Sequence, residues 1–131
     1  MRNFAKLGAL VIAAAALTAC TVAPIHNVSE APVASATGRN LSNDQVRAAI
    51  VRAGAGLGWQ MREEGPNMLV GTLNLRTHTA VVEIPYNTRT YGIRYRSSVN
   101  LHEANGTIHK NYNGWIQNLT QAINAQLSTA S

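Results

Sequence analysis

Residues 68–97 read MLVGTLNLRTHTAVVEIPYNTRTYGIRYRS, and apolar side chains recur at alternate positions through most of this stretch. Alternation with a period of two is typical of β-strands with one buried and one solvent-facing side. Polar turn residues divide the stretch into runs at 68–76, 80–86 and 91–97. Together with the short alternating run 59–62 before them, these runs predict an antiparallel meander of three to four strands.

The same alternation assigns side chains to the two faces of the predicted sheet. A shift of one residue would move every side chain of a strand to the other face. The apolar face is expected to hold Leu69, Leu73, Leu75, Ala80, Val82, Ile84, Tyr86, Tyr91, Ile93 and Tyr95. The polar face is expected to hold Thr72, Asn74, Arg76, Thr79, Glu83, Arg94 and Arg96.

Two helices are expected to flank these strands. Ser42 or Asn43 can cap the first helix, whose apolar face is formed by Val46, Ala49, Ile50 and Ala53. Apolar residues in 108–127 recur at spacings of three and four, which predicts a long amphipathic C-terminal helix. Gly114 within that helix costs about 1 kcal/mol relative to alanine, which suggests close packing there or a later helix start.

One α+β arrangement satisfies all of these patterns. Each helix has one apolar stripe and the sheet has one apolar face, so the N-terminal and C-terminal helices are expected to pack on the same face of the sheet. This helix-grip-like domain is predicted to occupy residues 41–128. Its length is enough for a modest core without disulfides.

The start of the chain has the pattern of an export signal. Arg2 and Lys6 precede the apolar run LGALVIAAAALTA at 7–19, which is too short to span a bilayer as a helix. Leu17-Thr18-Ala19-Cys20 then resembles the lipobox of bacterial lipoproteins. The resemblance implies that residues 1–19 are a signal peptide, that the Cys20 sulfur carries a diacylglyceryl group and that the new amine is acylated, for example with palmitate.

A lipid anchor at Cys20 would hold the mature chain on a membrane, because two or more acyl chains give stable anchoring. The residue after the cysteine is Thr21 rather than the Asp associated with inner-membrane retention, so the expected location is the periplasmic face of the bacterial outer membrane. Residues 20–40 are rich in Ala, Pro, Ser and Thr without a helical or strand period. This composition predicts a flexible tether with a span of about 25 Å.

Charge and cysteine content exclude several classes of protein. The 131 residues include 11 basic and 6 acidic side chains, but two of the basic ones lie in the leader, so the mature chain has little excess positive charge and no nucleic-acid partner is expected. The single cysteine excludes an internal disulfide and a cysteine-built zinc site. The histidines lack metal-ligand spacing, and no metal or other cofactor is predicted; they are His26, His78, His102 and His109.

The domain resembles a family of small, functionally uncharacterised proteobacterial lipoproteins. The resemblance covers most of residues 41–127 and is carried by Gly58-Trp59, by the alternating runs 76–86 and 91–101, and by Ile108-His109 with Tyr112-Asn113 and Trp115-Ile116. It implies an envelope location and no particular activity. The expected topology is also similar to the helix-grip domains of the C lipoprotein of the outer-membrane barrel-assembly machinery, as an analogy of fold alone.

Two groups of side chains are candidate sites, and neither has the pattern of an enzyme. No nucleophile elbow, phosphate-binding glycine loop or pair of inward carboxylates is present. The first candidate is a partner-binding face formed by Arg76, Arg94, Arg96 and Glu83; its alternative is a solvated sheet face. The second is a cleft between helices and sheet lined by Trp59, Tyr86, Tyr95, Tyr112 and Trp115; its alternative is ordinary core.

These candidates lead to two hypotheses for function. The first is a non-enzymatic binding or scaffold module that is anchored in the outer membrane and contacts an envelope protein or glycan. The second is a small-ligand carrier that uses the aromatic cleft. An enclosed pocket beside Trp59 and Trp115 favours the carrier, whereas a filled core favours the scaffold.

Overall fold

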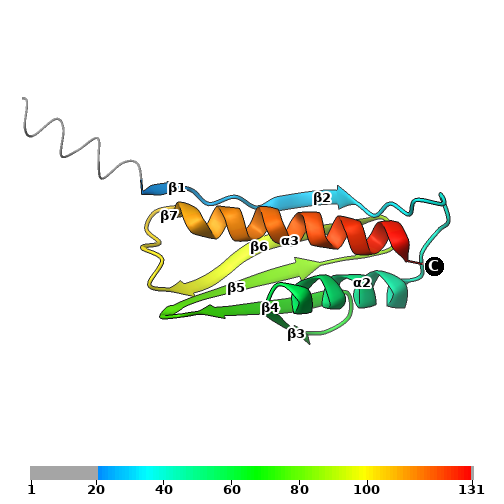
Figure 1. Cartoon of the computed structure of the whole chain (residues 1–131), viewed down its shortest axis with the longest axis horizontal. Coiled ribbons are helices and arrows are strands. Elements are labelled where there is room, and N and C mark those ends of the chain that lie inside the picture. The colour runs from blue at the N-terminus through cyan, green and yellow to red at the C-terminus, as the bar shows by residue number, and fades with distance from the viewer. Residues whose placement is uncertain (1–20, 131) are drawn as a thin grey trace, which may run out of the picture.

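The computed structural model describes residues 21–130 and has the α+β architecture expected from the sequence. Figure 1 shows two helices that run alongside the strands of a curved sheet. In chain order the elements are β1 (Val22–Pro24), β2 (Val28–Pro32), α2 (Asn43–Gly56), β3 (Trp59–Glu63), β4 (Met68–Leu75), β5 (His78–Pro85), β6 (Thr90–Val99), β7 (Thr107–His109) and α3 (Lys110–Thr129). The predicted signal peptide, 1–19, and Cys20 lie outside the described residues.

The main sheet has five antiparallel strands in the order β2-β6-β5-β4-β3. Strands β3 to β6 form the predicted meander, with β4 and β5 paired along their whole length, from Met68 opposite Pro85 to Leu75 opposite His78. The expected count of three to four strands was wrong because β2 adds a fifth strand at the edge of β6. A separate two-stranded ribbon joins β1 to β7.

The structure differs from the expected flexible tether over residues 22–32, which form β1 and β2. Val28 pairs with Ile93, and Ala31 pairs with Tyr91, so β2 extends the sheet. The segment between the two strands is held as well, because the Asn27 side chain accepts a hydrogen bond from the backbone N–H of Tyr95 at 2.9 Å. This part of the chain is therefore a component of the domain.

A β-bulge explains why the sequence pattern concealed β2. The register between β2 and β6 shifts between Val28 and Ala31, and Glu30 within the shift has a φ of 49°. A bulge places an extra residue in one strand and breaks the two-residue repeat of its side chains. The apolar residues that pack against the core from this segment, Ile25, Val28, Ala31 and Val33, consequently follow no single period.

The two helices begin and bury their faces much as the sequence predicts. Ser42 caps α2 in a capping box, in which its hydroxyl accepts from the backbone N–H of Gln45 at 3.1 Å and the Gln45 side chain accepts from the backbone N–H of Ser42 at 2.8 Å. The buried residues of α2 are Val46, Ala49, Ile50, Ala53 and Gly54. Those of α3 are Tyr112, Ile116, Leu119, Ile123 and Leu127. Ile108, expected in this helix, lies in β7.

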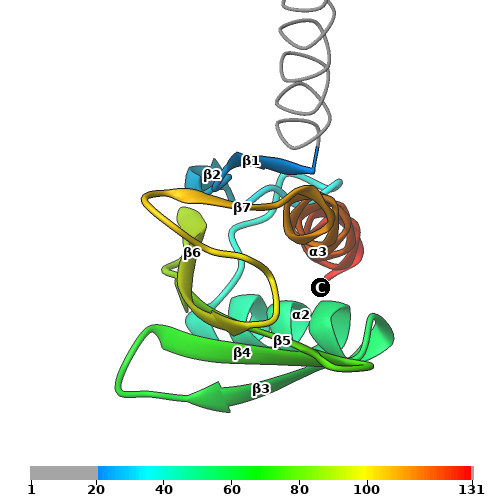
Figure 2. The same cartoon turned by 90° about the vertical axis from the view of Figure 1, so that its left-hand side faces the viewer.

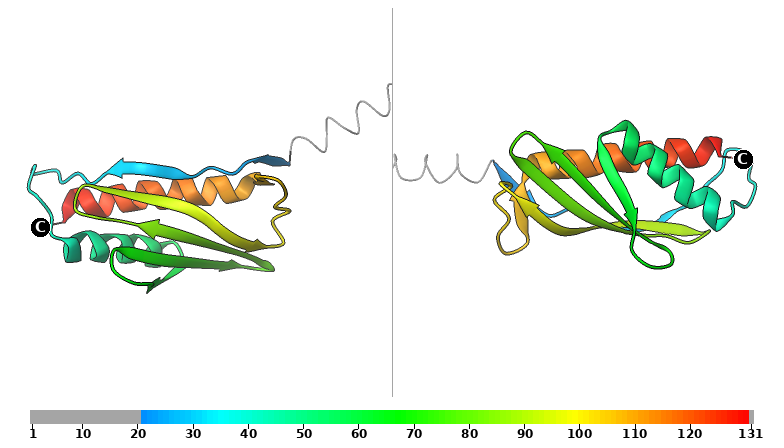
Figure 3. Two further views of the ribbon diagram at one scale, coloured as in Figure 1. Left: turned by 180° about the vertical axis from the view of Figure 1, so that it is seen from behind. Right: turned by 90° about the horizontal axis from the view of Figure 1, so that it is seen from below.

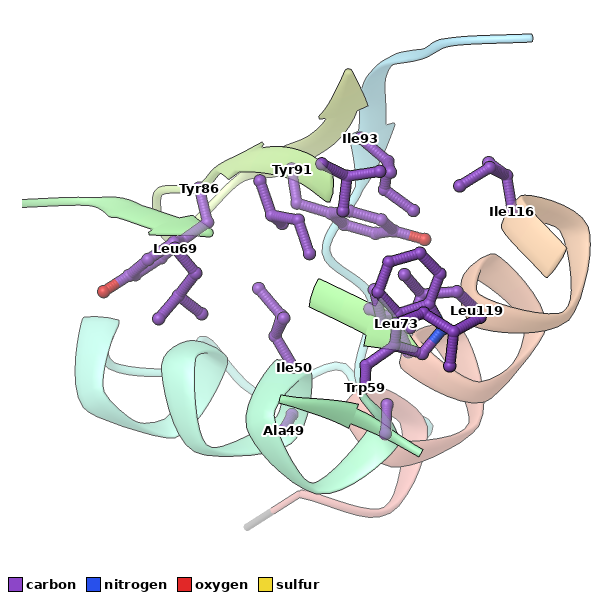
Figure 4. Close-up of a cluster of buried hydrophobic side chains, with 14 of the residues drawn as sticks. Ala49, Ile50, Trp59, Leu69, Leu73, Tyr86, Tyr91, Ile93, Ile116 and Leu119 are labelled. Atoms are coloured by element: carbon purple, nitrogen blue, oxygen red, sulfur yellow. The ribbon is translucent and has the colours of Figure 1, made fainter. Parts of the chain in front are cut away.

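Both helices lie on the concave side of the sheet, as expected (Figures 2 and 3). Most of the predicted apolar sheet face is buried against them; Leu75 is exposed and Tyr95 is half-buried. Figure 4 shows side chains from α2, α3 and the sheet converging on one cluster. One hydrophobic core therefore unites the helices with the strands.

Glycine permits the close approach of α2 to β3. A Cβ atom built on Gly54 would lie 2.4 Å from the Cε atom of Met61 and 3.3 Å from the Cβ atom of Trp59. Gly71 in β4 faces the same two side chains, with a built Cβ 3.0 Å from the Met61 sulfur. These two glycines leave the space in which Trp59 is buried.

By contrast, Gly114 in α3 has nothing within 4 Å of a built Cβ, so the close packing suggested for it is absent.

Candidate functional site

The outer face of the sheet, the side away from the helices, carries a network of ion pairs. Arg96 lies at a bulge in β6, where Val81 pairs with Ser97 and Val82 pairs with Tyr95. Its Nη1 atom donates to both carboxylate oxygens of Glu64, at 3.0 and 2.9 Å. The hydrogen bond from Arg96 lowers the pKa of Glu64 from its usual value and raises the pKa of Arg96 itself.

Further pairs extend this network. Glu83 lies 3.8 Å from Arg94 and 3.9 Å from Arg96, measured between carboxylate oxygens and guanidinium nitrogens. Arg62 lies 3.2 Å from Glu64. The face expected to have three arginines and one acid therefore contains Arg62, Arg94 and Arg96 with Glu64 and Glu83, which leaves one excess positive charge.

Arg76, predicted to lie on this face, does not belong to the network. Strand β4 ends at Leu75, and Arg76 occupies the turn before β5 with a φ of 56°. Among the described residues it has no hydrogen-bond or ion-pair partner. The prediction was wrong because the alternation was extended one residue past the strand, into a turn where period-two geometry no longer applies. Three of the four predicted residues, Glu83, Arg94 and Arg96, are brought together.

Sequence reasoning missed three members of this face: Arg62, Glu64 and Val70. Glu64 follows the end of β3 and so has no place in a strand pattern, although the acid-rich run Arg62-Glu63-Glu64 is a visible signal. Val70 lies on the outer face between its cross-strand neighbours Arg62 and Glu83, yet it is only 1% exposed. Because the aliphatic parts of long charged side chains cover apolar surface, the network also shields this valine from water.

An open groove of about 600 Å³ lies beside the network, where β2 pairs with the start of β6 next to the β5–β6 turn. Gly92 and Arg94 alternate with the buried Tyr91 and Ile93, which places both on the outer face. A Cβ on Gly92 would lie 2.9 Å from the Val28 carbonyl oxygen, so glycine permits the approach of β2. The groove is lined by Val28, Ser29, Glu30, Asn67, Pro85, Tyr86, Asn87, Thr90, Tyr91, Gly92 and Arg94.

The aromatic side chains proposed for a ligand cleft contribute mainly to the core. Trp59, Tyr86 and Tyr112 are each at most 7% exposed. Tyr95 is half-buried; its ring meets that of Tyr112 edge to face with centroids 5.7 Å apart, and its hydroxyl lies 2.8 Å from the Ser98 hydroxyl. Burial raises the pKa of Tyr112, whose hydroxyl has no hydrogen-bond partner among the described residues.

Trp115 is half-buried and lines a small cavity of about 160 Å³. Three histidines line the same cavity, namely His78, His102 and His109. His109 caps α3 by accepting from the Asn111 N–H at 3.1 Å. Within residues 21–130 no three His, Cys, Asp or Glu side chains are arranged to hold a metal ion.

Comparison of the chain with protein-family models, curated proteins and solved structures gives no match. No helix in the described part is both long and apolar enough to cross a membrane.

Proposed function

We propose that this chain is a bacterial outer-membrane lipoprotein, anchored at the periplasmic face through Cys20, and that its domain is a non-enzymatic module that binds another envelope component. The lipobox-like sequence Leu17-Thr18-Ala19-Cys20 supports the anchor. The groove formed by β2, the start of β6 and the β5–β6 turn supports the binding role, and it is the observation on which that role rests.

The groove has the chemistry of a site for an extended polypeptide segment. Apolar side chains such as Val28 and Pro85 line it together with polar groups and two opposite charges, Glu30 and Arg94. The groove is open to solvent and has a volume of about 600 Å³. Strand β2 is an edge strand of the sheet, and exposed strand edges are common sites for added peptide strands.

Arg94 is the arginine best placed to recognise such a segment. Its guanidinium nitrogen is 3.8 Å from Glu83, whereas Arg96 lies 2.9 Å from Glu64. The Arg94 side chain is 53% exposed and lines the groove. A carboxylate on the partner would form a charge-assisted hydrogen bond with this guanidinium. We therefore infer a protein segment with an acidic side chain as the partner.

The small-ligand carrier receives less support from the structure. A carrier of this kind would require the aromatic residues to line a cleft, but Trp59, Tyr86 and Tyr112 are buried in the core. Of these three, only Tyr86 also borders the groove. The burial of these rings favours the binding module.

Site-specific photocrosslinking in cells that naturally produce the chain tests the proposed binding role. A photoreactive amino acid at Ser29, in the groove, should give a discrete adduct, whereas the same amino acid at Gln117, an exposed position of α3, should not. Arg94→Glu should abolish the Ser29 adduct, and Arg39→Glu, an exposed loop substitution, should leave it unchanged. Equal crosslinking at both positions would contradict a groove-specific partner.

A further inference from the structure

The described chain begins at a fixed point beside the start of α3. The backbone N–H of Lys110 donates to the Thr21 carbonyl at 3.1 Å, and Val22 pairs with His109 in the β1–β7 ribbon. Consecutive Cα atoms are about 3.8 Å apart, and Cys20 directly precedes Thr21. A lipid on Cys20 would therefore be attached one residue from the folded domain, with no spacer between them.

Hydrogen bonds gather several other segments at the same end of the molecule. The side-chain amide of Asn100 donates to the Thr77 carbonyl at 3.0 Å, which ties the loop after β6 to the β4–β5 turn. The backbone N–H of His109 donates to the Leu101 carbonyl at 2.8 Å, which ties that loop to β7. Figures 1 and 3 show the start of β1, β7 and the β4–β5 turn at one end, with the C-terminus at the other.

This end, which we call the anchor end, is formed by residues 75–78, 99–110 and 21–22. It carries two exposed large hydrophobic side chains, Leu75 at 44% and Val99 at 55%. Its exposed cations are Arg76 and Lys110, and among the described residues neither has an ion-pair partner. The other ionisable groups are Glu103, His78, His102 and His109, so the anchor end has one net positive charge when the histidines are neutral.

The local backbone gives no reason for arginine at position 76. Its φ of 56° belongs to the left-handed region, where glycine and asparagine are favoured. Exposed apolar side chains flanked by cations are typical of surfaces that meet a membrane interface, because the cations attract anionic headgroups while the apolar groups leave water. The residue types at the anchor end therefore suit a lipid surface.

We propose that the anchor end rests directly on the surface of the membrane that holds the lipid, with Arg76 and Lys110 against anionic headgroups and Leu75 and Val99 in the interface. This inference rests on the proposed lipidation of Cys20. The 20 residues of α3 run from the anchor end toward the C-terminal end, a length of about 30 Å. The β5–β6 turn, which borders the groove, lies at the C-terminal end of the molecule (Figure 1) and would therefore face away from the membrane.

Fluorescence quenching in vesicles tests this orientation. The full chain with the substitution Val99→Cys is produced in a bacterial host that lipidates exported proteins. It is then labelled with a thiol-reactive fluorophore, which reacts at position 99 but not with a lipidated Cys20. Vesicles contain phosphatidylethanolamine, phosphatidylglycerol and a lipid with a nitroxide on its headgroup. The matched control is Val51→Cys on α2, where valine is 38% exposed. We expect quenching several-fold stronger at position 99 than at position 51.

Charge substitutions complete the test. Arg76→Glu should reduce quenching at position 99, whereas Arg89→Glu, in the turn before β6, should not. Replacing phosphatidylglycerol with phosphatidylcholine should have the same effect as Arg76→Glu. Equal quenching at positions 99 and 51, or quenching that is insensitive to Arg76→Glu, would overturn the proposed orientation while leaving the anchor intact. An intact mass without lipid on Cys20 would overturn the anchor itself, and the two failures are thus distinguishable.

Discussion

Replacing a buried tyrosine with phenylalanine removes one hydroxyl oxygen, and we expect this change to raise the free energy of unfolding at Tyr112 and to lower it at Tyr91. The Tyr112 hydroxyl is buried with no hydrogen-bond partner among residues 21–130. The Tyr91 hydroxyl donates to the side-chain oxygen of Asn124 at 2.6 Å, and burial raises the pKa of Tyr91 to about 12. The rings are equally well buried, at 0% and 1% exposure, so the phenylalanine variants differ chiefly in this hydrogen bond.

The magnitudes follow from the cost of an unsatisfied polar group. A buried hydroxyl without a partner costs about 1–3 kcal/mol, whereas a satisfied hydrogen bond contributes about 0.5–1.5 kcal/mol. Tyr112→Phe should therefore raise the free energy of unfolding by about 1–3 kcal/mol. Tyr91→Phe should lower it by about 0.5–1.5 kcal/mol, because the exposed Asn124 amide can exchange its lost partner for water.

Urea denaturation of a chain that begins at Thr21, followed by tryptophan fluorescence and far-ultraviolet circular dichroism, measures both variants. An unchanged dependence on urea concentration confirms that the midpoints report stability. If Tyr112→Phe proves less stable than the parent by about 1 kcal/mol or more, its hydroxyl has a hydrogen-bond partner. The reasoning from burial would then be refuted.

Three further predictions concern packing, the edge strand and charge. Gly54→Ala should destabilise the domain, because the added methyl group displaces Met61 and crowds the Cβ of Trp59 at a cost of about 1–3 kcal/mol, which exceeds the gain in helix propensity of about 0.5–1 kcal/mol. Gly114→Ala should show that gain alone and stabilise the domain by about 0.5–1 kcal/mol; urea midpoints compare the two. A chain that begins at Arg39 lacks β1 and β2 and should unfold at a clearly lower urea concentration than one that begins at Thr21; equal midpoints would show that these strands are dispensable. The pKa of Glu64 is lowered in the folded state, so its ionised form stabilises the fold above pH 4.5, and this contribution is lost as the pH falls through the folded pKa. The difference in free energy of unfolding between the parent and Glu64→Gln should therefore shrink as the pH is lowered through this range.

Regular periodicity accounts for the parts of the fold that the sequence predicted. In β5 the buried residues Ala80, Val82 and Ile84 fall at alternate positions, and in α3 the buried positions follow spacings of three and four. Such repeats are visible in the sequence because each element buries one face along most of its length. For the N-cap of α2 the sequence offered Ser42 or Asn43, and the structure has Ser42, whose spacing from Gln45 is that of a capping box.

The predictions from sequence fail where the local backbone geometry departs from that of a regular strand. Residues 22–32 contain two prolines and a bulge at Glu30, so their composition indicated a tether although their side chains pack on the core. The pairing partners of β2 lie some 60 residues away in β6, and no pattern within the segment encodes that contact. The candidate site was affected in the same way, because Arg76 lies in a turn and Glu64 lies beyond a strand.

The ion pairs on the outer face of the sheet indicate which of its arginines is free to bind a partner, which the sequence alone does not. Two of the three arginines on the outer face, Arg62 and Arg96, share Glu64, while Glu83 lies at 3.8–3.9 Å from Arg94 and Arg96. A partner carboxylate that approached Arg96 would compete with two short hydrogen bonds already made to Glu64. The same carboxylate at Arg94 would replace only a long contact, and it would do so beside a groove. Selective recognition on this face should therefore depend on Arg94, with Arg96 acting to hold the network in place.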